Sequence, residues 1–264
     1  MEFSQSTTPL SSLQTPHFFN FPFIEQTVRF TKEFKEQFKM SNPIKNLTKK
    51  EWLLWTGSLL IITVSNILSG DISFLTLITA WVGVTSLIFA AKGNVWAQIL
   101  MIVFSVLYGI ISYQFRYWGE MVTYLGMTLP MAVWSTITWI KNPSESGNEV
   151  AIQRLTKKHI AGIVFFGAII TVLFYYILRA LDTPNIVLST ISIATSFIAA
   201  ALTMLRSSYY ALGYASNDIV LIILWVLASI EDPIYITVAV NFVIFFFNDM
   251  YGFISWKKRE KTQN

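Results

Sequence analysis

The sequence contains no cysteine and only two histidines, which excludes several kinds of chemistry at the outset. Without cysteine there is no disulfide, no thiolate nucleophile and no cysteine-ligated metal. His17 lies near the N-terminus and His159 at the start of an apolar stretch, so they do not form the pair that a zinc site or a buried triad needs. The glycines form neither a P-loop nor a dinucleotide fingerprint. We therefore expect no metal, no cofactor and no hydrolase activity.

Charged side chains are also scarce. Only 13% of the 264 residues are Asp, Glu, Lys or Arg, whereas 54% are apolar and the mean hydropathy is +0.54. Soluble domains carry about a quarter charged residues, so this chain has too few to cover a water-facing surface. We expect an integral membrane protein whose net charge of +4 reflects contact with membrane lipid and not nucleic-acid binding.

Eight apolar stretches are each close to the roughly 20 residues that a helix needs to cross a bilayer. They lie at 52–68, 72–91, 94–114, 118–140, 159–179, 185–205, 208–229 and 233–256. Most connections between them are short, but 141–158 contains Pro, Ser, Gly and charged residues typical of a loop.

The N-terminal region differs from the rest of the chain. Residues 1–20 are rich in Ser, Thr, Gln and Pro, lack the features of a secretory signal, and are expected to be disordered. Phe23, Phe30, Phe34 and Phe38 then recur at helical spacing with basic residues on another arc, which predicts an amphipathic helix on the membrane surface. The alternative is a solvated connector.

Lys and Arg divide unequally between the two sides of the predicted spans. Seventeen fall on the side of the termini, and two, Arg116 and Arg179, fall on the other. Basic loops mark the cytoplasmic side of a membrane protein. We therefore expect both termini in the cytoplasm and the chain in the cytoplasmic (inner) membrane, with an even number of spans.

A weak internal repeat organises the spans. WVGVTSLIFAAKGNVWAQ (81–98) aligns with TSFIAAALTMLRSSYYAL (195–212), which pairs Lys92 with Arg206. The fold class expected is an all-α membrane protein with a seven-helix core of two parallel three-helix repeats joined by a linker helix, in 3+1+3 order. The units predicted are a tail with the amphipathic helix (1–50), an additional transmembrane helix (51–70), repeat 1 (71–140), a cytoplasmic loop and linker helix (141–183), repeat 2 (184–256) and a basic cytoplasmic tail (257–264).

Two aspartates lie inside predicted spans. An ionisable side chain at a helix centre costs about 2.5–3.5 kcal/mol on insertion scales, so Asp218 and Asp249 are candidates for function. Trp225 follows Asp218 by seven residues, on nearly the same side of the helix. That pair suits a cationic ring, with the carboxylate as counter-ion and the indole as a cation–π face. The alternatives are that Asp218 pairs with Arg206 or a headgroup, and that Asp249 lies at the membrane interface.

Other polar and aromatic side chains in the spans extend this set of candidates. Gln98 begins a stripe with Ser105 and Ser112, although small hydroxyls at that spacing also serve helix packing. The remaining candidates offer hydrogen bonds or ring stacking, and they are Tyr108, Tyr124, Trp134, Asn217 and Asn248.

Three segments resemble the PnuC family of vitamin-precursor transporters: VLYGIISYQFRYWGE (106–120), SNDIVLIILW (216–225) and NDMYGFISW (248–256). The resemblance covers about 72–256 and is also one of topology, because that family has a parallel three-plus-one-plus-three fold. In the first repeat Pro130 stands where a counterpart of Asn248 is expected, so site residues are not carried over symmetrically.

The resemblance implies a transporter that takes up nicotinamide riboside for NAD biosynthesis by facilitated diffusion and forms a homotrimer. Trp and Tyr suit the pyridinium ring, Gln98, Asn217 and Asn248 suit the carboxamide and hydroxyls, and Asp218 suits the charge. No Lys or Arg lies near a span centre to bind a phosphate, so we expect mononucleotides to be excluded.

Three alternatives stay open at this point. Thiamine or another vitamin could be the substrate, since thiamine also has a cationic aromatic ring. Asp218 or Asp249 could carry a proton and couple uptake to a gradient. A membrane enzyme acting on lipid headgroups with these two acids is less well supported, because such sites usually gather more carboxylates or histidines.

Overall fold

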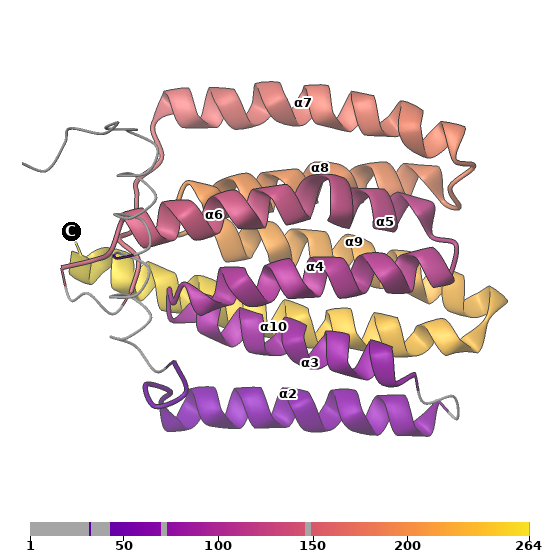
Figure 1. Cartoon of the computed structure of the whole chain (residues 1–264), viewed down its shortest axis with the longest axis horizontal. Coiled ribbons are helices and arrows are strands. Elements are labelled where there is room, and N and C mark those ends of the chain that lie inside the picture. The colour runs from indigo at the N-terminus through magenta and orange to yellow at the C-terminus, as the bar shows by residue number, and fades with distance from the viewer. Residues whose placement is uncertain (1–31, 33–42, 70–72, 146–148, 264) are drawn as a thin grey trace, which may run out of the picture.

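The computed structural model describes residues 32, 43–69, 73–145 and 149–263, so the predicted disordered tail and almost all of the amphipathic helix lie outside the described residues. The described chain forms a bundle of helices that run alternately up and down (Figure 1). In order, these are α2 (Lys49–Leu68), α3 (Phe74–Ala91), α4 (Trp96–Gln114), α5 (Trp118–Thr123), the π-helix η1 (Tyr124–Thr128), α6 (Leu129–Lys141), α7 (Lys157–Ala180), α8 (Ile186–Met204), α9 (Tyr210–Glu231), the 3₁₀-helix η2 (Pro233–Tyr235) and α10 (Ile236–Gln263).

Seven helices in the described part of the chain are long and apolar enough to cross a membrane, one fewer than predicted. The difference lies in the predicted span 118–140, which is divided into α5, η1 and α6 although the helical path runs unbroken from 118 to 141. Pro130 is at the start of α6. Its ring would clash with the carbonyl four residues earlier and it has no N–H to donate, so the preceding turn widens into a π-helix.

The helix ends agree closely with the sequence prediction except at the C-terminus. α10 continues through Gln263, so most of the segment predicted as a basic tail is helical. The starts of α2, α4 and α7, the 142–156 loop and the end of α10 share one end of the bundle, here called the basic end (Figure 1).

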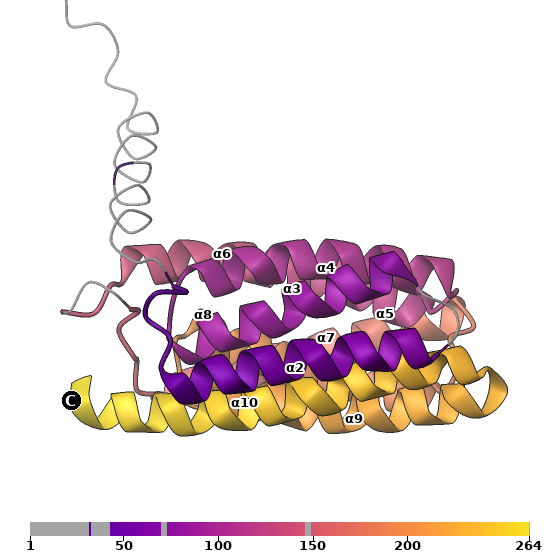
Figure 2. The same ribbon diagram turned by 90° about the horizontal axis from the view of Figure 1, so that it is seen from below.

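The bundle has buried central helices and outer helices that face lipid. In α3, 67% of the apolar window is buried inside the protein, against 22% in α2 and 6% in α7. α7 packs on α8, and α2 packs on α3 and α10. Seen from below, α2 and α10 lie along one side of the bundle and α6 along the other (Figure 2). The apolar side chains exposed on α2 and α7 suit hydrocarbon as their solvent.

Two buried tryptophans tie the basic ends of the central helices together. Trp139 Nε1 of α6 donates to the Thr203 carbonyl of α8 at 2.9 Å. Trp256 Nε1 of α10 donates to the Ala90 carbonyl of α3 at 2.7 Å. The two rings are fully buried with centroids 5.5 Å apart. Carbonyls in the last turn of a helix have no partner within it, so these indoles satisfy groups that would otherwise be unpaired.

The 142–156 loop closes over the same helix ends. Val150 N donates to the Gly93 carbonyl at 2.9 Å and Gln153 N donates to the Arg206 carbonyl at 3.0 Å. Gly93 and Arg206 both have positive φ, 65° and 54°. A Cβ at Gly93 would lie 2.2 Å from Arg259 Nη2, so a larger residue there would displace the Arg259 guanidinium as well as strain the backbone.

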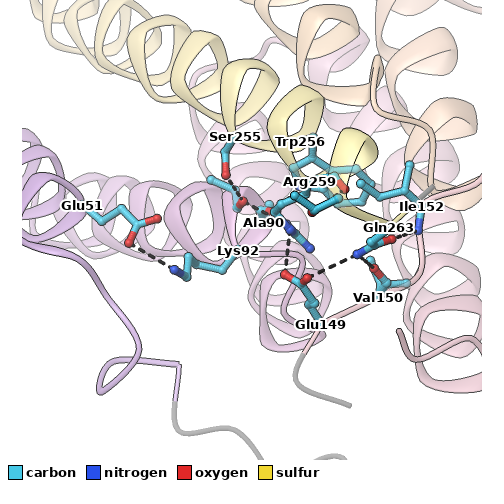
Figure 3. Close-up of polar contacts among 12 residues, drawn as sticks. Glu51, Ala90, Lys92, Glu149, Val150, Ile152, Ser255, Trp256, Arg259 and Gln263 are labelled. Carbon is cyan, nitrogen blue, oxygen red and sulfur yellow. Dashed lines mark hydrogen bonds and ion pairs between the residues drawn. The ribbon is translucent and has the colours of Figure 1, made fainter. Parts of the chain in front are cut away.

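The extension of α10 holds this loop in place (Figure 3). Arg259 forms an ion pair with Glu149 at 2.6 Å, and Gln263 accepts from Ile152 N at 2.8 Å. On the other side of the end of α3, Lys92 pairs with Glu51 of α2 at 3.3 Å. Helices distant in sequence are therefore joined at the basic end by polar contacts.

We expect Trp256→Phe to lower the melting temperature of the detergent-solubilised protein. The Ala90 carbonyl would lose its buried donor, which costs about 1–3 kcal/mol. Trp134→Phe is the matched control, because that ring is 59% exposed and faces outward. Thermal unfolding followed by intrinsic fluorescence measures both, and equal melting temperatures for the two variants would contradict the stabilising role of the Trp256 hydrogen bond.

Candidate functional site

A small cavity lined by both apolar and polar side chains lies in the middle of the bundle, between α3, α4, η1, α8, α9 and α10. Its lining residues are Gly83, Leu87, Met101, Phe104, Tyr124, Thr128, Ser196, Tyr214, Asn217, Asp218, Phe242, Phe245 and Asp249. Its volume of about 30 Å³ holds a water molecule or two. A larger ligand can enter only if the helices or side chains around it move apart.

The cavity contains the two aspartates that the sequence singled out. Asp218 of α9 and Asp249 of α10 are 4% and 3% exposed, and their carboxyl groups lie within hydrogen-bonding reach of each other. Asp218 Oδ2 has no hydrogen-bond partner among the described residues. Two carboxylates this close repel each other unless a proton or a cation lies between them. Asp218 does not pair with Arg206, whose guanidinium donates instead to Gln153 at 2.8 Å.

Asn217 joins α8 to α9 beside the acid pair. Its Oδ1 accepts from Thr195 at 2.8 Å, Ser196 at 3.1 Å and Ser192 at 3.3 Å. An amide oxygen with three donors is fully used, so the Nδ2 group is the part of this side chain left to donate to a ligand.

Aromatic rings form the wall of the cavity on the side away from the basic end. Phe104 stacks on Tyr108 with centroids 5.5 Å apart, and Tyr108 lies 4.4 Å from Tyr124. Beyond this wall is a second cavity of about 20 Å³, lined by Thr76, Thr79, Tyr108 and Asn241 among others. Phe104, Phe242 and Phe245 line both cavities and separate them.

Trp225 lies outside the cavity, in the packed region beyond Tyr108. Its indole is fully buried and donates to Tyr108 Oη at 3.1 Å, and its ring lies 4.6 Å from that of Tyr117. The structure therefore does not bring Trp225 and Asp218 together around one space. Trp225 instead holds the hydroxyl of Tyr108, which lies next to Tyr124 in the cavity wall.

The other three residues expected at the site lie elsewhere. Asn248 Nδ2 donates to Ser58 of α2 at 2.9 Å and to the Ile244 carbonyl at 2.8 Å, so it joins α10 to α2. Gln98 is buried but does not line either cavity. Trp134 is on the outer surface.

Several cavity residues were not singled out from the sequence. Tyr214 and Phe245 each precede one of the aspartates by four residues, the spacing that places two side chains on one helix face. Both residues could therefore have been identified from the sequence by their spacing from the aspartates. Glu120 of α5 lines neither cavity, but it is 2% exposed and its Oε2 has no partner among the described residues.

Comparison with known proteins identifies relatives of this chain. Residues 73–258 match the family described as nicotinamide mononucleotide transporter. The chain is 25% identical over 198 residues to a nicotinamide riboside transporter PnuC of Neisseria mucosa, covering 73% of this chain and 75% of the relative. It is 23% identical over 214 residues to the corresponding protein of Haemophilus influenzae, covering 80% and 92%. Its fold is similar to the crystal structure of the vitamin B3 transporter PnuC, with a TM-score of 0.72 at 23% identity over 83% of this chain and 95% of that one.

We expect Asn217→Ala to destabilise the contact between α8 and α9. The buried hydroxyls of Ser192 and Ser196 and the half-buried hydroxyl of Thr195 would lose their shared acceptor, at a cost of about 1–3 kcal/mol. Asn217→Asp keeps an acceptor and Ser216→Ala changes an exposed neighbour, so both serve as controls. Thermal unfolding in detergent measures the three variants, and an Asn217→Ala protein as stable as Ser216→Ala would contradict this role.

Proposed function

The chain belongs to the nicotinamide mononucleotide transporter family, and we propose that it takes up nicotinamide riboside through the central cavity. It is a multi-pass membrane protein and a transporter, not an enzyme. The observation that carries the choice of substrate is the buried pair Asp218 and Asp249, whose carboxyl groups can share a proton or bind a cation. The family match spans both residues, and the two curated relatives are named as nicotinamide riboside transporters.

The lining of the cavity suits the parts of this substrate. A pyridinium ring is a flat cation, so it is attracted by the carboxylates and by the faces of Tyr124 and Phe245. The Asn217 amide can donate to the carboxamide, and the hydroxyls of Thr128 and Ser196 can bind the ribose. We propose Tyr124, Asn217, Asp218 and Asp249 as contacts to the substrate.

Four other residues would act outside the substrate contacts. In this proposal Trp225 and Tyr108 position the aromatic wall through their 3.1 Å hydrogen bond. Gln98 and Asn248 have structural roles, since neither lines the cavity and Asn248 is bonded to α2.

Transport would follow from the 3+1+3 organisation, with α3 to α6 as one half, α8 to α10 as the other and α7 as the linker. Equivalent contacts at the basic end support this division. Ala90 and Thr203 are equivalent acceptors, and Trp256 and Trp139 are their donors from the opposite half. Gly93 and Arg206, which both have positive φ, are separated by the same number of residues as Ala90 and Thr203. This separation is one residue shorter than in the sequence alignment, which pairs Lys92 with Arg206.

The halves would rock about the cavity to give alternating access. The small size of the cavity supports this, because a nucleoside cannot enter without such a movement. The sequence offers no nucleotide-binding motif, so facilitated diffusion is the proposed mode. The excess of basic residues at one end supports placing both termini in the cytoplasm and the protein in the inner membrane. The resemblance to the PnuC family also suggests a homotrimer.

A second mode, proton-coupled uptake, is favoured by the same acid pair. A proton can occupy the position between the carboxyl groups when the substrate leaves. Uptake into vesicles with and without an imposed pH gradient distinguishes the two modes. Equal rates would reject proton coupling, and a gradient-dependent rate would reject facilitated diffusion. Thiamine remains the alternative substrate and is tested in parallel.

We expect Asp218→Asn to weaken the binding of nicotinamide riboside by about 10- to 100-fold, because one charge-assisted contact is worth about 1.5–3 kcal/mol. Calorimetric titration of the detergent-solubilised protein measures this. Asp232→Asn is the matched control, since Asp232 is an exposed acid outside the cavity. Unchanged affinity in the Asp218 variant would contradict its role as counter-ion.

The same titration decides between the riboside and its mononucleotide. In the described part of the chain neither Lys nor Arg lines either cavity, so a phosphate would be desolvated without a partner. We therefore expect saturable binding of the riboside and at least about tenfold weaker binding of the mononucleotide. Comparable affinities for both would contradict this account.

A further inference from the structure

A larger groove lies on the outside of the bundle, apart from the two internal cavities. It is a groove of about 520 Å³ between η1, α6, α7 and α8. Its wall is formed mainly by apolar residues, among them Met127, Ile163, Phe166 and Phe197. The volume falls in the range of about 300–1,000 Å³ typical of ligand pockets.

The groove follows one stripe of α7 inward from the basic end. Lys158, His159, Gly162, Ile163, Phe166 and Ile170 line it. From Lys158 to Ile170 the helix advances twelve residues and rises about 18 Å. Half of a hydrocarbon core about 30 Å thick is about 15 Å. The length of the groove is therefore close to the thickness of the hydrocarbon region of one leaflet.

The charged part of the groove lies at its outer end, where headgroups are found. Lys158 and His159 both line it, and Lys157 beside them is exposed. His159 Nδ1 accepts from Thr156 N at 3.3 Å, so Nε2 carries the ring proton in the neutral form and is the atom free to donate to a ligand. The lining contains no Asp or Glu. These groups suit an anion bound to an apolar chain.

A groove at the other end of the bundle provides a comparison. It lies between α2 and α10, has a volume of about 500 Å³, and is lined by apolar residues and two serines, with no basic side chain. Its size is similar but it offers nothing to distinguish one headgroup from another. Of these two grooves, the α7 groove is the one whose lining can select an anionic lipid.

We propose that the α7 groove is a binding site for one anionic phospholipid. An acyl chain lies along the stripe from Gly162 to Ile170, and the phosphate receives hydrogen bonds from Lys158 and His159. Basic pockets between transmembrane helices recognise anionic headgroups by this combination. The lipid fills the space between α7 and α6 and touches Met127 of η1, the segment that also carries Tyr124. The site does not depend on which solute the central cavity carries.

Gly162 allows the apolar part of the site to be tested without disturbing the fold. A Cβ added at Gly162 meets no atom within 4 Å, so a phenylalanine there enters the groove and displaces a chain. Gly57 of α2 is equally open and lies outside the groove, so Gly57→Phe is its matched control. For the headgroup, Lys158→Gln with His159→Gln is compared with Lys50→Gln, an exposed lysine at the same end of the bundle.

The measurement is native mass spectrometry of the full chain, released from detergent containing phosphatidylglycerol or phosphatidylcholine with identical acyl chains. We expect one retained phosphatidylglycerol per chain and about tenfold less phosphatidylcholine, because both lipids offer a phosphate but the choline cation of the second is repelled by Lys158. The double variant should lose the preference for phosphatidylglycerol, and Gly162→Phe should lose the retained lipid. Gly57→Phe and Lys50→Gln should match the unchanged protein.

Three outcomes would overturn the proposal. Equal retention of the two lipids by the unchanged protein would show that Lys158 and His159 do not select an anionic headgroup. If Gly162→Phe retained as much phosphatidylglycerol as the unchanged protein, the lipid would not lie in the α7 groove. A change of oligomeric mass in Gly162→Phe without loss of lipid would assign the groove to contact between copies of the chain. Melting temperatures of all variants confirm that each is folded.

Discussion

Polar groups within a membrane must find partners inside the protein, and most of this structure follows from that requirement. The helices satisfy their own backbones except in their last turns. At the basic end those carbonyls are met by the indoles of Trp139 and Trp256 and by the backbone of the 142–156 loop. Because the donors come from helices distant in sequence, satisfying the backbone also joins the two sides of the bundle.

One buried group without a partner lies in the cavity that we propose as the substrate site. Asn217 is held by three hydroxyls, whereas Asp218, four residues from Tyr214 on the same helix, keeps one carboxylate oxygen unpaired. A buried polar atom without a partner costs about 1–3 kcal/mol. In the proposed function a ligand offsets this cost by supplying the missing contact to Asp218. The cavity around Asp218 is too small for a nucleoside, so in the proposed function the substrate binds as the helices move.

The relatives of this chain carry two descriptions, one naming a mononucleotide and the other a riboside. They differ by a phosphate, and the riboside is the proposed substrate because the charged groups of the cavity are carboxylates. Repulsion between Asp218, Asp249 and a phosphate would add to the cost of desolvation. The basic residues instead gather at one end of the bundle, where they close the helix ends and, at Lys158 and His159, line the outer groove.

The sequence alone was enough to predict the helices, the basic end and the two aspartates of the cavity. Hydrophobic length and the scarcity of charge decide these, and neither depends on how helices pack. Packing decided the rest. The π-helical turn before Pro130 divides one predicted span into three segments without breaking the helical path, and Trp225, which follows Asp218 along one helix, donates to Tyr108 instead. Trp134 lies on the outer surface, and Asn248 is bonded to α2. The side of a helix that meets the cavity is set by the neighbouring helices and not by its own residues.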